Sequence, residues 1–185
     1  MQKPHPEIVC TSLSRNLNSV IGLTEKGWNL ISSNFLQPAS LKFHYMGLKK
    51  AKKIPNFKRN WRVARNIFVN PNKSVVEKYV FSNSSPYVFC IKQILQKLKK
   101  SNRLDVFKKN PDDIKEKINI DNLIDDLVIR GSVEEVSEKI LELKENVGNF
   151  DTITYVGIDW QKPALAKKSM ELMATKVMPI LNKAG

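Results

Sequence analysis

The sequence is poor in the residues that build metal sites and nucleotide-binding loops. Only two cysteines (Cys10, Cys90) and two histidines (His5, His44) occur among 185 residues, and no CxxC or HExxH spacing is present. The motifs GxGxxG, GxxxxGK[ST] and GxSxG are also absent. We therefore predict no metal site, no P-loop or Rossmann dinucleotide site and no α/β-hydrolase nucleophile, and these motifs identify no catalytic residue.

Long apolar runs are missing as well. No stretch approaches the ~18 apolar residues of a membrane helix, and the N-terminal residues 1–7 carry no apolar segment typical of a signal peptide. Cys10 and Cys90 lie far apart without partner motifs, which indicates buried free thiols in a reducing compartment. The sequence thus predicts a cytoplasmic protein that does not enter a membrane.

Acidic residues are scarce in the first 110 positions. Residues 1–110 hold 21 Lys and Arg against 4 Asp and Glu, residues 111–185 hold 10 against 14, and the formal net charge is +13. A basic surface attracts nucleic acids, anionic membranes or phosphorylated ligands. Most of the excess is lysine, and no aromatic stacking motif accompanies the segment 42–59. We expect a solvated basic face and keep an RNA- or anion-binding domain as an alternative.

Helices and strands alternate along the chain. Strands are predicted at 7–13, 28–33, 61–69 and 152–156, each rich in β-branched or aromatic residues and bounded by turn residues. Helices are predicted at about 14–26, 38–53, 74–85, 87–100, 133–147 and 163–178. Strands separated by crossover helices favour a parallel sheet, and hence an α/β fold.

The last third of the sequence has the clearest signals for the beginning and end of a helix. Ser132 and Glu135 have the spacing of a capping box, and Gly148 is placed to end the helix that follows. Ser74 is expected to cap the helix after the third strand. Residues 101–120 are expected to form a loop and a short acidic helix after Pro111.

Side-chain alternation in strand 61–69 separates two faces. Val63, Ile67 and Val69 fall on one face, and Arg62, Asn66 and Phe68 on the other. The second face would suit a barrel interior near a ligand, with Asn66 and, from the preceding strand, Ser32 as pocket-lining candidates. Arg65 has the opposite parity and is expected to support the outer layer. His44 lies on a lysine-rich helix, where we expect an exposed or capping role.

The turn from Ser12 to Asn18 joins a strand end to a helix start. Such a place presents unpaired N–H groups and a partial positive charge, which suit a phosphate. Ser12, Ser14 and Asn16 are therefore the predicted cofactor-binding residues, with Arg15 as an additional donor. Ordinary helix capping by Ser14 or Asn16 is the alternative.

Several segments together resemble luciferase-like flavin-dependent monooxygenases. They are Ile129–Val136 (IRGSVEEV), Gly148–Thr152 (GNFDT), Ser169–Met173 (SMELM) with Val177–Pro179, the strand Trp61–Val69 (WRVARNIFV) and the turn Leu13–Asn16 followed by Gly27. The resemblance implies a TIM barrel that binds reduced FMN and uses O₂ to oxidise an organic substrate, often with a separate flavin reductase. Ser14 matches the family's phosphate-binding serine, while Arg15 stands at its usual proline and Leu17 at its usual threonine or serine.

The resemblance also predicts what part of a barrel is present. A (β/α)8 barrel needs about 250 residues, and the four predicted strands correspond to its second half. We therefore expect residues 1–185 to form a partial TIM barrel of about four C-terminal β/α units that requires an N-terminal half-barrel or self-association. Residues 73–127 would be a helical insertion, either a lid on the substrate side or a surface helix pair. A catalytically inactive flavin-binding or oligomerisation module is a further alternative.

Overall fold

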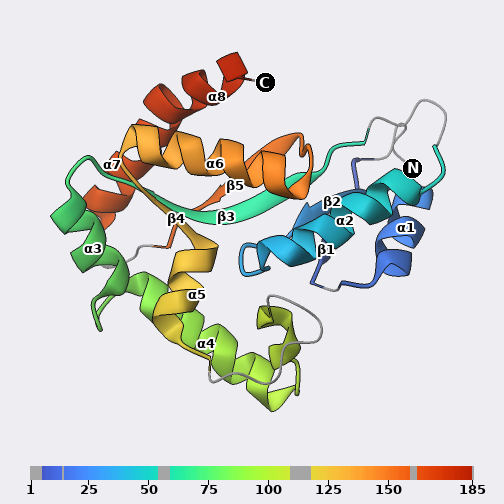
Figure 1. Cartoon of the computed structure of the whole chain (residues 1–185), viewed down its shortest axis with the longest axis horizontal. Coiled ribbons are helices and arrows are strands. Elements are labelled where there is room, and N and C mark those ends of the chain that lie inside the picture. The colour runs from blue at the N-terminus through green and yellow to red at the C-terminus, as the bar shows by residue number, and fades with distance from the viewer. Residues whose placement is uncertain (1–5, 14, 54–58, 109–117, 159–161, 185) are drawn as a thin grey trace.

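The computed structural model describes residues 6–13, 15–53, 59–108, 118–158 and 162–184. Helices and strands alternate through most of this length (Figure 1). The elements are β1 (Val9–Ser12), α1 (Leu17–Glu25), β2 (Asn29–Ser32), α2 (Pro38–Lys50), β3 (Arg62–Val69), α3 (Lys73–Phe81), α4 (Pro86–Lys100), η1 (Leu104–Phe107), α5 (Ile120–Leu127), β4 (Val128–Gly131), α6 (Val133–Val147), β5 (Thr152–Val156), α7 (Pro163–Leu172), the π-helix η2 (Met173–Val177) and α8 (Met178–Ala184).

The strands form one open parallel sheet centred on β3. β1 pairs with β2, and β2 pairs with the beginning of β3. β5 also pairs with β3, and because Arg62 is matched with Ile31 of β2 and with Thr152 of β5, these two strands occupy opposite edges of β3. β1, β2, β3 and β5 therefore form a consecutive arc, which matches the four strands predicted from the sequence.

The short strand β4 was not predicted. It pairs with the last four residues of β3, from Asn66↔Val128 to Val69↔Gly131. Asn66 is matched with β5 as well, so β4 lies on the same edge of β3 as β2 and continues that edge where β2 ends. Its four residues stand between α5 and the capping box without the flanking turn residues that bound the predicted strands.

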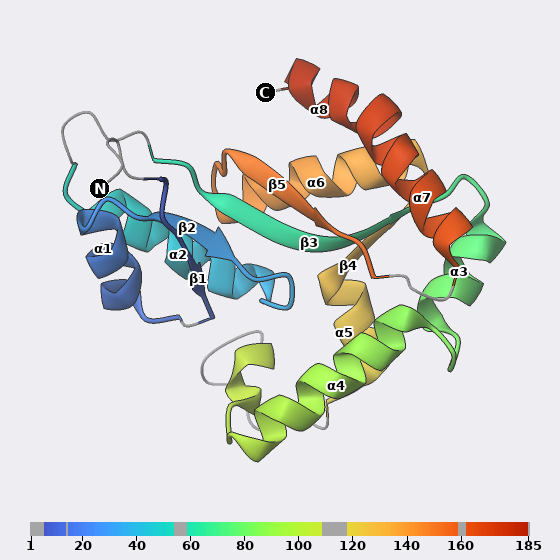
Figure 2. The ribbon, with the colours of Figure 1, turned by 180° about the vertical axis from the view of Figure 1, so that it is seen from behind.

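The two faces of the sheet differ in cover. In Figure 1, α2 and α6 lie in front of the strands. In Figure 2, which shows the molecule from the opposite side, the strands lie in front of these two helices and other helices lie at the margins. On the outer, helix-covered face Val63, Ile67 and Val69 are each 0% exposed. On the inner face Thr152 and Thr154 are only partly buried. Along β3 the inner face is buried as well, since Ala64, Asn66 and Phe68 are 6%, 3% and 1% exposed. The described sheet is thus an arc whose inside is exposed mainly at its outer strands, consistent with a partial α/β barrel.

The described part of residues 73–127 packs against the carboxyl end of β3. Phe68 lies against the rings of Tyr79 and Tyr87, with centroids at 4.4 and 6.4 Å, and the Tyr87 hydroxyl donates to the Ile67 carbonyl at 3.3 Å. The described part of this excursion is mainly helical. The predicted acidic helix after Pro111 falls largely outside the described residues.

Helix ends agree with most of the predicted signals. Ser132 and Glu135 form the capping box, and Gly148 ends α6 with a φ of 110°. The prediction for Ser74 was wrong: Asn72 caps α3, because its side chain accepts the Val75 N–H at 3.2 Å. The predicted closing helix is interrupted by the π-helical turn η2.

Two further expectations concern thiols and membranes. Cys10 and Cys90 are both free, but each is partly exposed rather than buried as predicted. Burial of its sulfur still raises the pKa of the Cys90 thiol. Among the described residues no helix is long and apolar enough to span a membrane.

Candidate functional site

The turn between β1 and α1 begins the candidate site. Ser12 ends β1 and is 7% exposed. Asn16 is the N-cap of α1, and its side-chain oxygen accepts the Asn18 N–H at 2.9 Å, so capping by Asn16 is confirmed. The first turn of α1 carries no acidic residue. Ser14 lies outside the described residues.

Arg15 ties this turn to two other parts of the chain. Its Nε donates to Ser40 Oγ in the first turn of α2 at 2.9 Å, and its Nη2 donates to the Lys108 carbonyl just after η1. Both acceptors are neutral oxygens. Close by, the rings of Phe35 and Phe107 lie 6.5 Å apart. The β1–α1 turn, the β2–α2 loop and the excursion therefore meet at one end of the sheet.

Ser32 belongs to a buried hydrogen-bond chain. The Trp61 indole N–H donates to Ser32 Oγ at 2.8 Å, and the same oxygen lies 2.7 Å from Nδ1 of His44. Ser32 and His44 are both 0% exposed. The prediction of an exposed or capping His44 was wrong, because the histidine lies on the side of α2 that covers the sheet.

Asn66 lies on the inner face, as predicted. Its Oδ1 accepts the side-chain N–H of Asn34 at 2.8 Å, and it is 3% exposed. In the same loop after β2, Gln37 donates to Asp126 of α5 at 3.2 Å. Sequence reasoning missed Asn34 and Gln37, although their place directly after a parallel strand could have identified them.

The predicted residues do not form one cluster. Ser12 and Ser32 are register partners at the ends of β1 and β2, so their side chains share the outer face of the sheet. Asn66 lies on the inner face further along β3. The polar contacts at the carboxyl end of the sheet are separate pairs: Arg15 with Ser40, Asn34 with Asn66, and Gln37 with Asp126.

Arg65 is a buried cation on the outer face, in the layer predicted for it. It is 1% exposed, and burial lowers its pKa to about 10. Its Nη1 lies 3.5 Å from the Ser33 carbonyl and 3.4 Å from that of Ala64, while Nη2 has no hydrogen-bond partner among the described residues. β2 has ended at this level and β4 has not begun, so Arg65 occupies the interval between them.

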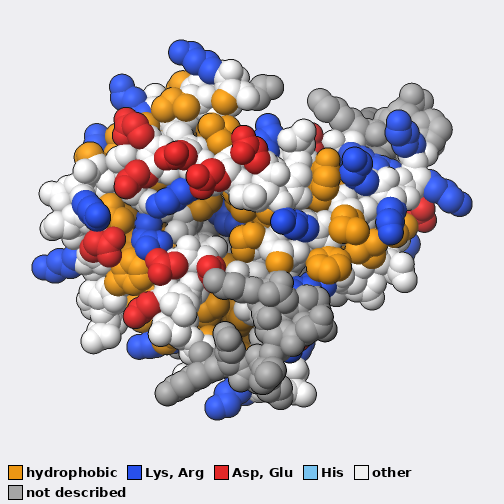
Figure 3. All heavy atoms as spheres, in the orientation of Figure 1, with side chains coloured by type: hydrophobic (Ala, Val, Ile, Leu, Met, Phe, Trp, Pro, Cys, Tyr) orange, Lys and Arg blue, Asp and Glu red, His pale blue; other side chains and the backbone are white. Residues whose placement is uncertain are grey.

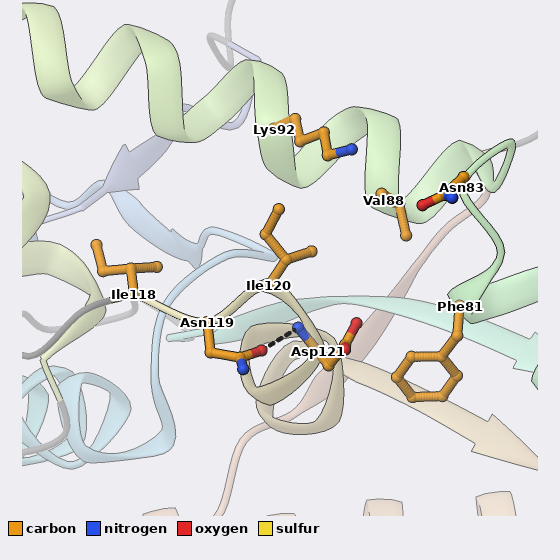
Figure 4. Close-up of a pocket in the computed structure, with 8 residues that line it drawn as sticks. All are labelled: Phe81, Asn83, Val88, Lys92, Ile118, Asn119, Ile120 and Asp121. Atoms are coloured by element: carbon orange, nitrogen blue, oxygen red, sulfur yellow. Dashed lines mark hydrogen bonds between the residues drawn. The ribbon is translucent and has the colours of Figure 1, made fainter.

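A cavity of about 460 Å³ lies elsewhere, between α4 and the start of α5 (Figure 4). Figure 4 shows Val88 and Lys92 on α4 opposite Ile118 and Ile120. None of the predicted cofactor residues lines it. Its lining is Phe81, Asn83, Val88, Lys92, Ile118, Asn119, Ile120 and Asp121.

Surface charge follows the asymmetry of the sequence. Acidic side chains gather over α6, and Lys and Arg side chains surround α2 on the opposite side of the same view (Figure 3). The acidic set on α6 is Glu134, Glu135, Glu138, Glu142 and Glu145; the basic set on and just after α2 is Lys42, Lys49, Lys50, Lys52 and Lys53.

No family model matches the chain, and no curated protein matches it. Solved structures share its fold. The oxygenating constituent of 3,6-diketocamphane monooxygenase of Pseudomonas putida, a type II Baeyer-Villiger monooxygenase in complex with FMN, is 24% identical with a TM-score of 0.73 over 95% of this chain and 49% of that one. Monooxygenase RslO1 of Streptomyces bottropensis is 13% identical, with a TM-score of 0.61 over 96% of this chain and 49% of its own.

A third structure, EDTA monooxygenase of Chelativorans sp. BNC1, is 12% identical with a TM-score of 0.54 over 97% of this chain and 45% of that one. This chain therefore spans about half the length of each solved structure. The resemblance to flavin-dependent monooxygenases that the sequence predicted is confirmed at the level of the fold.

Proposed function

We propose that this chain is part of a flavin-dependent monooxygenase of the luciferase-like type, and that the turn between β1 and α1 holds the phosphate of FMN. The observation that carries the proposal is that Ser12, Arg15 and the start of α1 follow one another at the carboxyl end of β1. Ligands of α/β sheets bind at this end of the strands. The fold shared with an FMN-bound monooxygenase supports it.

The residues present fit a phosphate. Ser12 brings a hydroxyl, Arg15 a guanidinium, and the first turn of α1 brings backbone N–H groups without a competing acidic side chain. Guanidinium groups and helix N-termini are the donors that proteins use for phosphate. Ser14, carried over from the family resemblance, would add a second hydroxyl.

The remaining groups would serve the organic part of the reaction. Reduced flavin held there would supply the electrons that activate O₂, and a separate reductase would supply the flavin. Asn66 and Asn34 lie on the inner side of the arc, where a ligand above the sheet would meet them. The excursion 73–127 would cover that side as a lid, since it already contacts Arg15 and Gln37.

Titration with FMN and with riboflavin under reducing conditions tests the proposal. We expect FMN to bind more tightly than riboflavin, and Ser12→Ala or Ser14→Ala to weaken FMN binding by about ten- to a hundredfold while riboflavin binding is unchanged, because one charge-assisted hydrogen bond contributes about 1.5–3 kcal/mol. Ser101→Ala, at the exposed end of α4, is the matched control. Equal affinity for FMN in wild type and both variants would refute the phosphate assignment.

A turnover assay separates the proposed enzyme from an inactive flavin-binding module. The enzyme consumes O₂ in the presence of reduced FMN and an organic substrate. Binding of FMN without oxygen consumption beyond the rate of free flavin would favour the inactive module.

A further inference from the structure

We propose that the inner face of the arc, with the outer edges of β1 and β5, is the docking surface for a second polypeptide segment that contributes further parallel strands. We further infer that this segment places a hydrogen-bond acceptor beside Arg62. The inference rests on the proposed function, since it names the partner that would complete that site.

The outer edges of the arc present unpaired backbone groups. The Asn29 N–H donates to the Ile8 carbonyl at 2.9 Å, which sets the phase of the β1–β2 ladder and turns the backbone groups of Val9 and Thr11 outward. In the described residues no strand pairs with this edge. Such an edge is a template for another strand.

The same holds at the other end of the arc. The Thr152 N–H donates to the Trp61 carbonyl at 3.2 Å, so that Thr152 and Thr154 face β3 and the backbone groups of Ile153 and Tyr155 point away from it. β5 pairs with β3 alone in the described sheet. Further parallel strands that paired with both β1 and β5 would satisfy the unpaired backbone groups of these two edges.

The inner face of the arc is buried along β3 but exposes apolar side chains on the strands beside it. On this face Val9 is 40% exposed, and Ile31 and Val156 are only partly buried. Leu30, beside Ile31 but on the outer face, is by contrast 1% exposed. Exposed apolar residues on a sheet face between two open edges indicate an interface rather than a solvated surface.

Arg62 points to the chemistry of the partner. It lies on the inner face, and its Nη2 pairs with Glu7 Oε2 at 2.9 Å. Its Nη1 is buried and has no hydrogen-bond partner among the described residues. A buried donor without an acceptor costs stability until one is supplied. A carboxylate or carbonyl on an apposed strand would supply it.

The length of the related structures argues for a different half rather than a second copy. This chain covers about half of each solved structure, so the shared fold has as much again to contribute. A second copy would bring its own Arg62 to the same layer of a closed barrel, where inward side chains meet. Two guanidinium groups would face each other, and two chains of formal charge +13 would repel.

Co-expression of the full chain with the half of the Pseudomonas putida oxygenating constituent that it does not match tests the proposal. We expect the isolated chain to bind a hydrophobic dye and to exchange the amides of Val9, Thr11, Ile153 and Tyr155 rapidly. We expect a one-to-one complex in which dye binding is lost and these amides are protected.

Arg62→Met provides the discriminating variant. In the complex it should weaken association about tenfold or more, because a charged hydrogen bond at an interface is lost, while the isolated chain keeps its fold. Lys42→Met removes a cation from the exposed outer side of α2 and is the matched control, with unchanged association.

Four results would overturn the inference. They are edge amides already protected in a monomer that binds no dye, a two-copy assembly that protects the same amides, failure of the complex to form, and equal association of Arg62→Met and wild type. None of these readouts requires flavin, so loss of the proposed phosphate site would leave the test intact.

Discussion

The indole N–H of Trp61 donates a 2.8 Å hydrogen bond to the hydroxyl of Ser32, joining the start of β3 to the end of β2. Trp61 is 2% exposed, so this donor has no access to water when its acceptor is removed. The bond lies where β2 and β3 share only two register pairs, Ile31↔Arg62 and Ser32↔Val63. The side chains thus reinforce a short backbone ladder.

Replacement of Ser32 by alanine should therefore destabilise the fold by about 1–3 kcal/mol, since a buried N–H is left without an acceptor. Urea unfolding followed by circular dichroism measures the change. Ser33→Ala is the control, because that hydroxyl makes a weaker 3.3 Å bond to its neighbour Asn34. Equal stability of the two variants would show that the Trp61 bond contributes nothing.

Ser169 anchors α7 to the sheet. Its Oγ accepts the Val69 N–H at 2.8 Å and lies 3.0 Å from the Tyr155 hydroxyl, and it is 0% exposed. We expect Ser169→Ala to cost about 1–3 kcal/mol. Ser137→Ala is a fair comparison, because that buried hydroxyl only bonds back to Val133 within α6 and should change stability little. A Ser169→Ala protein as stable as Ser137→Ala would contradict the anchoring role.

Tyr155 should make the fold sensitive to alkaline pH. Burial raises its pKa above the ordinary value, although its bond with Ser169 acts in the opposite direction. Because the folded-state pKa is the higher one, the contribution of the neutral hydroxyl is complete below about pH 10 and is lost as pH rises through the folded value. Tyr155→Phe should remove this loss, giving a flatter stability curve above about pH 10. Parallel curves for the two proteins in urea titrations would argue against it.

Gly148 cannot carry a side chain. Its φ of 110° is unfavourable for other residues, and a Cβ there would overlap the ring of Tyr45. Gly148→Ala should lower stability by about 2 kcal/mol or more. Gly22→Ala, inside α1 with nothing within 4 Å of the added carbon, should instead raise it by about 0.5–1 kcal/mol. Thermal unfolding of the pair tests the opposite signs.

Arg65 is a buried cation whose contacts with the described residues are long, at 3.4 and 3.5 Å to two carbonyl oxygens. We expect Arg65→Met to leave stability unchanged or to increase it by about 1–4 kcal/mol, because desolvation of an unpaired cation is costly. Arg59 is the contrasting arginine: it donates to the carbonyls of Leu48, Ala51 and Lys52 at 2.5, 2.9 and 2.5 Å. Its replacement by methionine should destabilise by about 1–3 kcal/mol. A strongly destabilising Arg65→Met would mean that the guanidinium has compensation not evident from its contacts.

Periodicity and end signals predicted most of the fold. The four strands of the arc, the Ser132–Glu135 capping box and the glycine at the end of α6 are local features, decided by residues a few positions apart. β4 was not predicted, because it follows α5 directly and no turn residues separate the helix from the strand. Asn72 replaced Ser74 as a cap because both residue types suit the position.

The candidate site was harder to predict because side-chain partners are not encoded locally. His44 is buried because α2 turns that face toward Ser32 and Trp61, which lie 12 and 17 positions away in the sequence. The side-chain bond between Asn34 and Asn66 likewise joins loops that meet only in the folded sheet. Residue types indicated polar side chains at the carboxyl ends of the strands, but not which of these side chains would form hydrogen bonds with one another.

In the described sheet β3 carries every connection between the β1–β2 pair, β4 and β5. In the described sheet no backbone pairing joins the β1–β2 pair, β4 and β5 directly to one another. Opening of β3 would therefore release all of them together, so its amides, with that of the fully buried Ile67 among them, should be the slowest to exchange and should report global unfolding. The outer strands can then fray independently, which leaves them free to open without loss of the core.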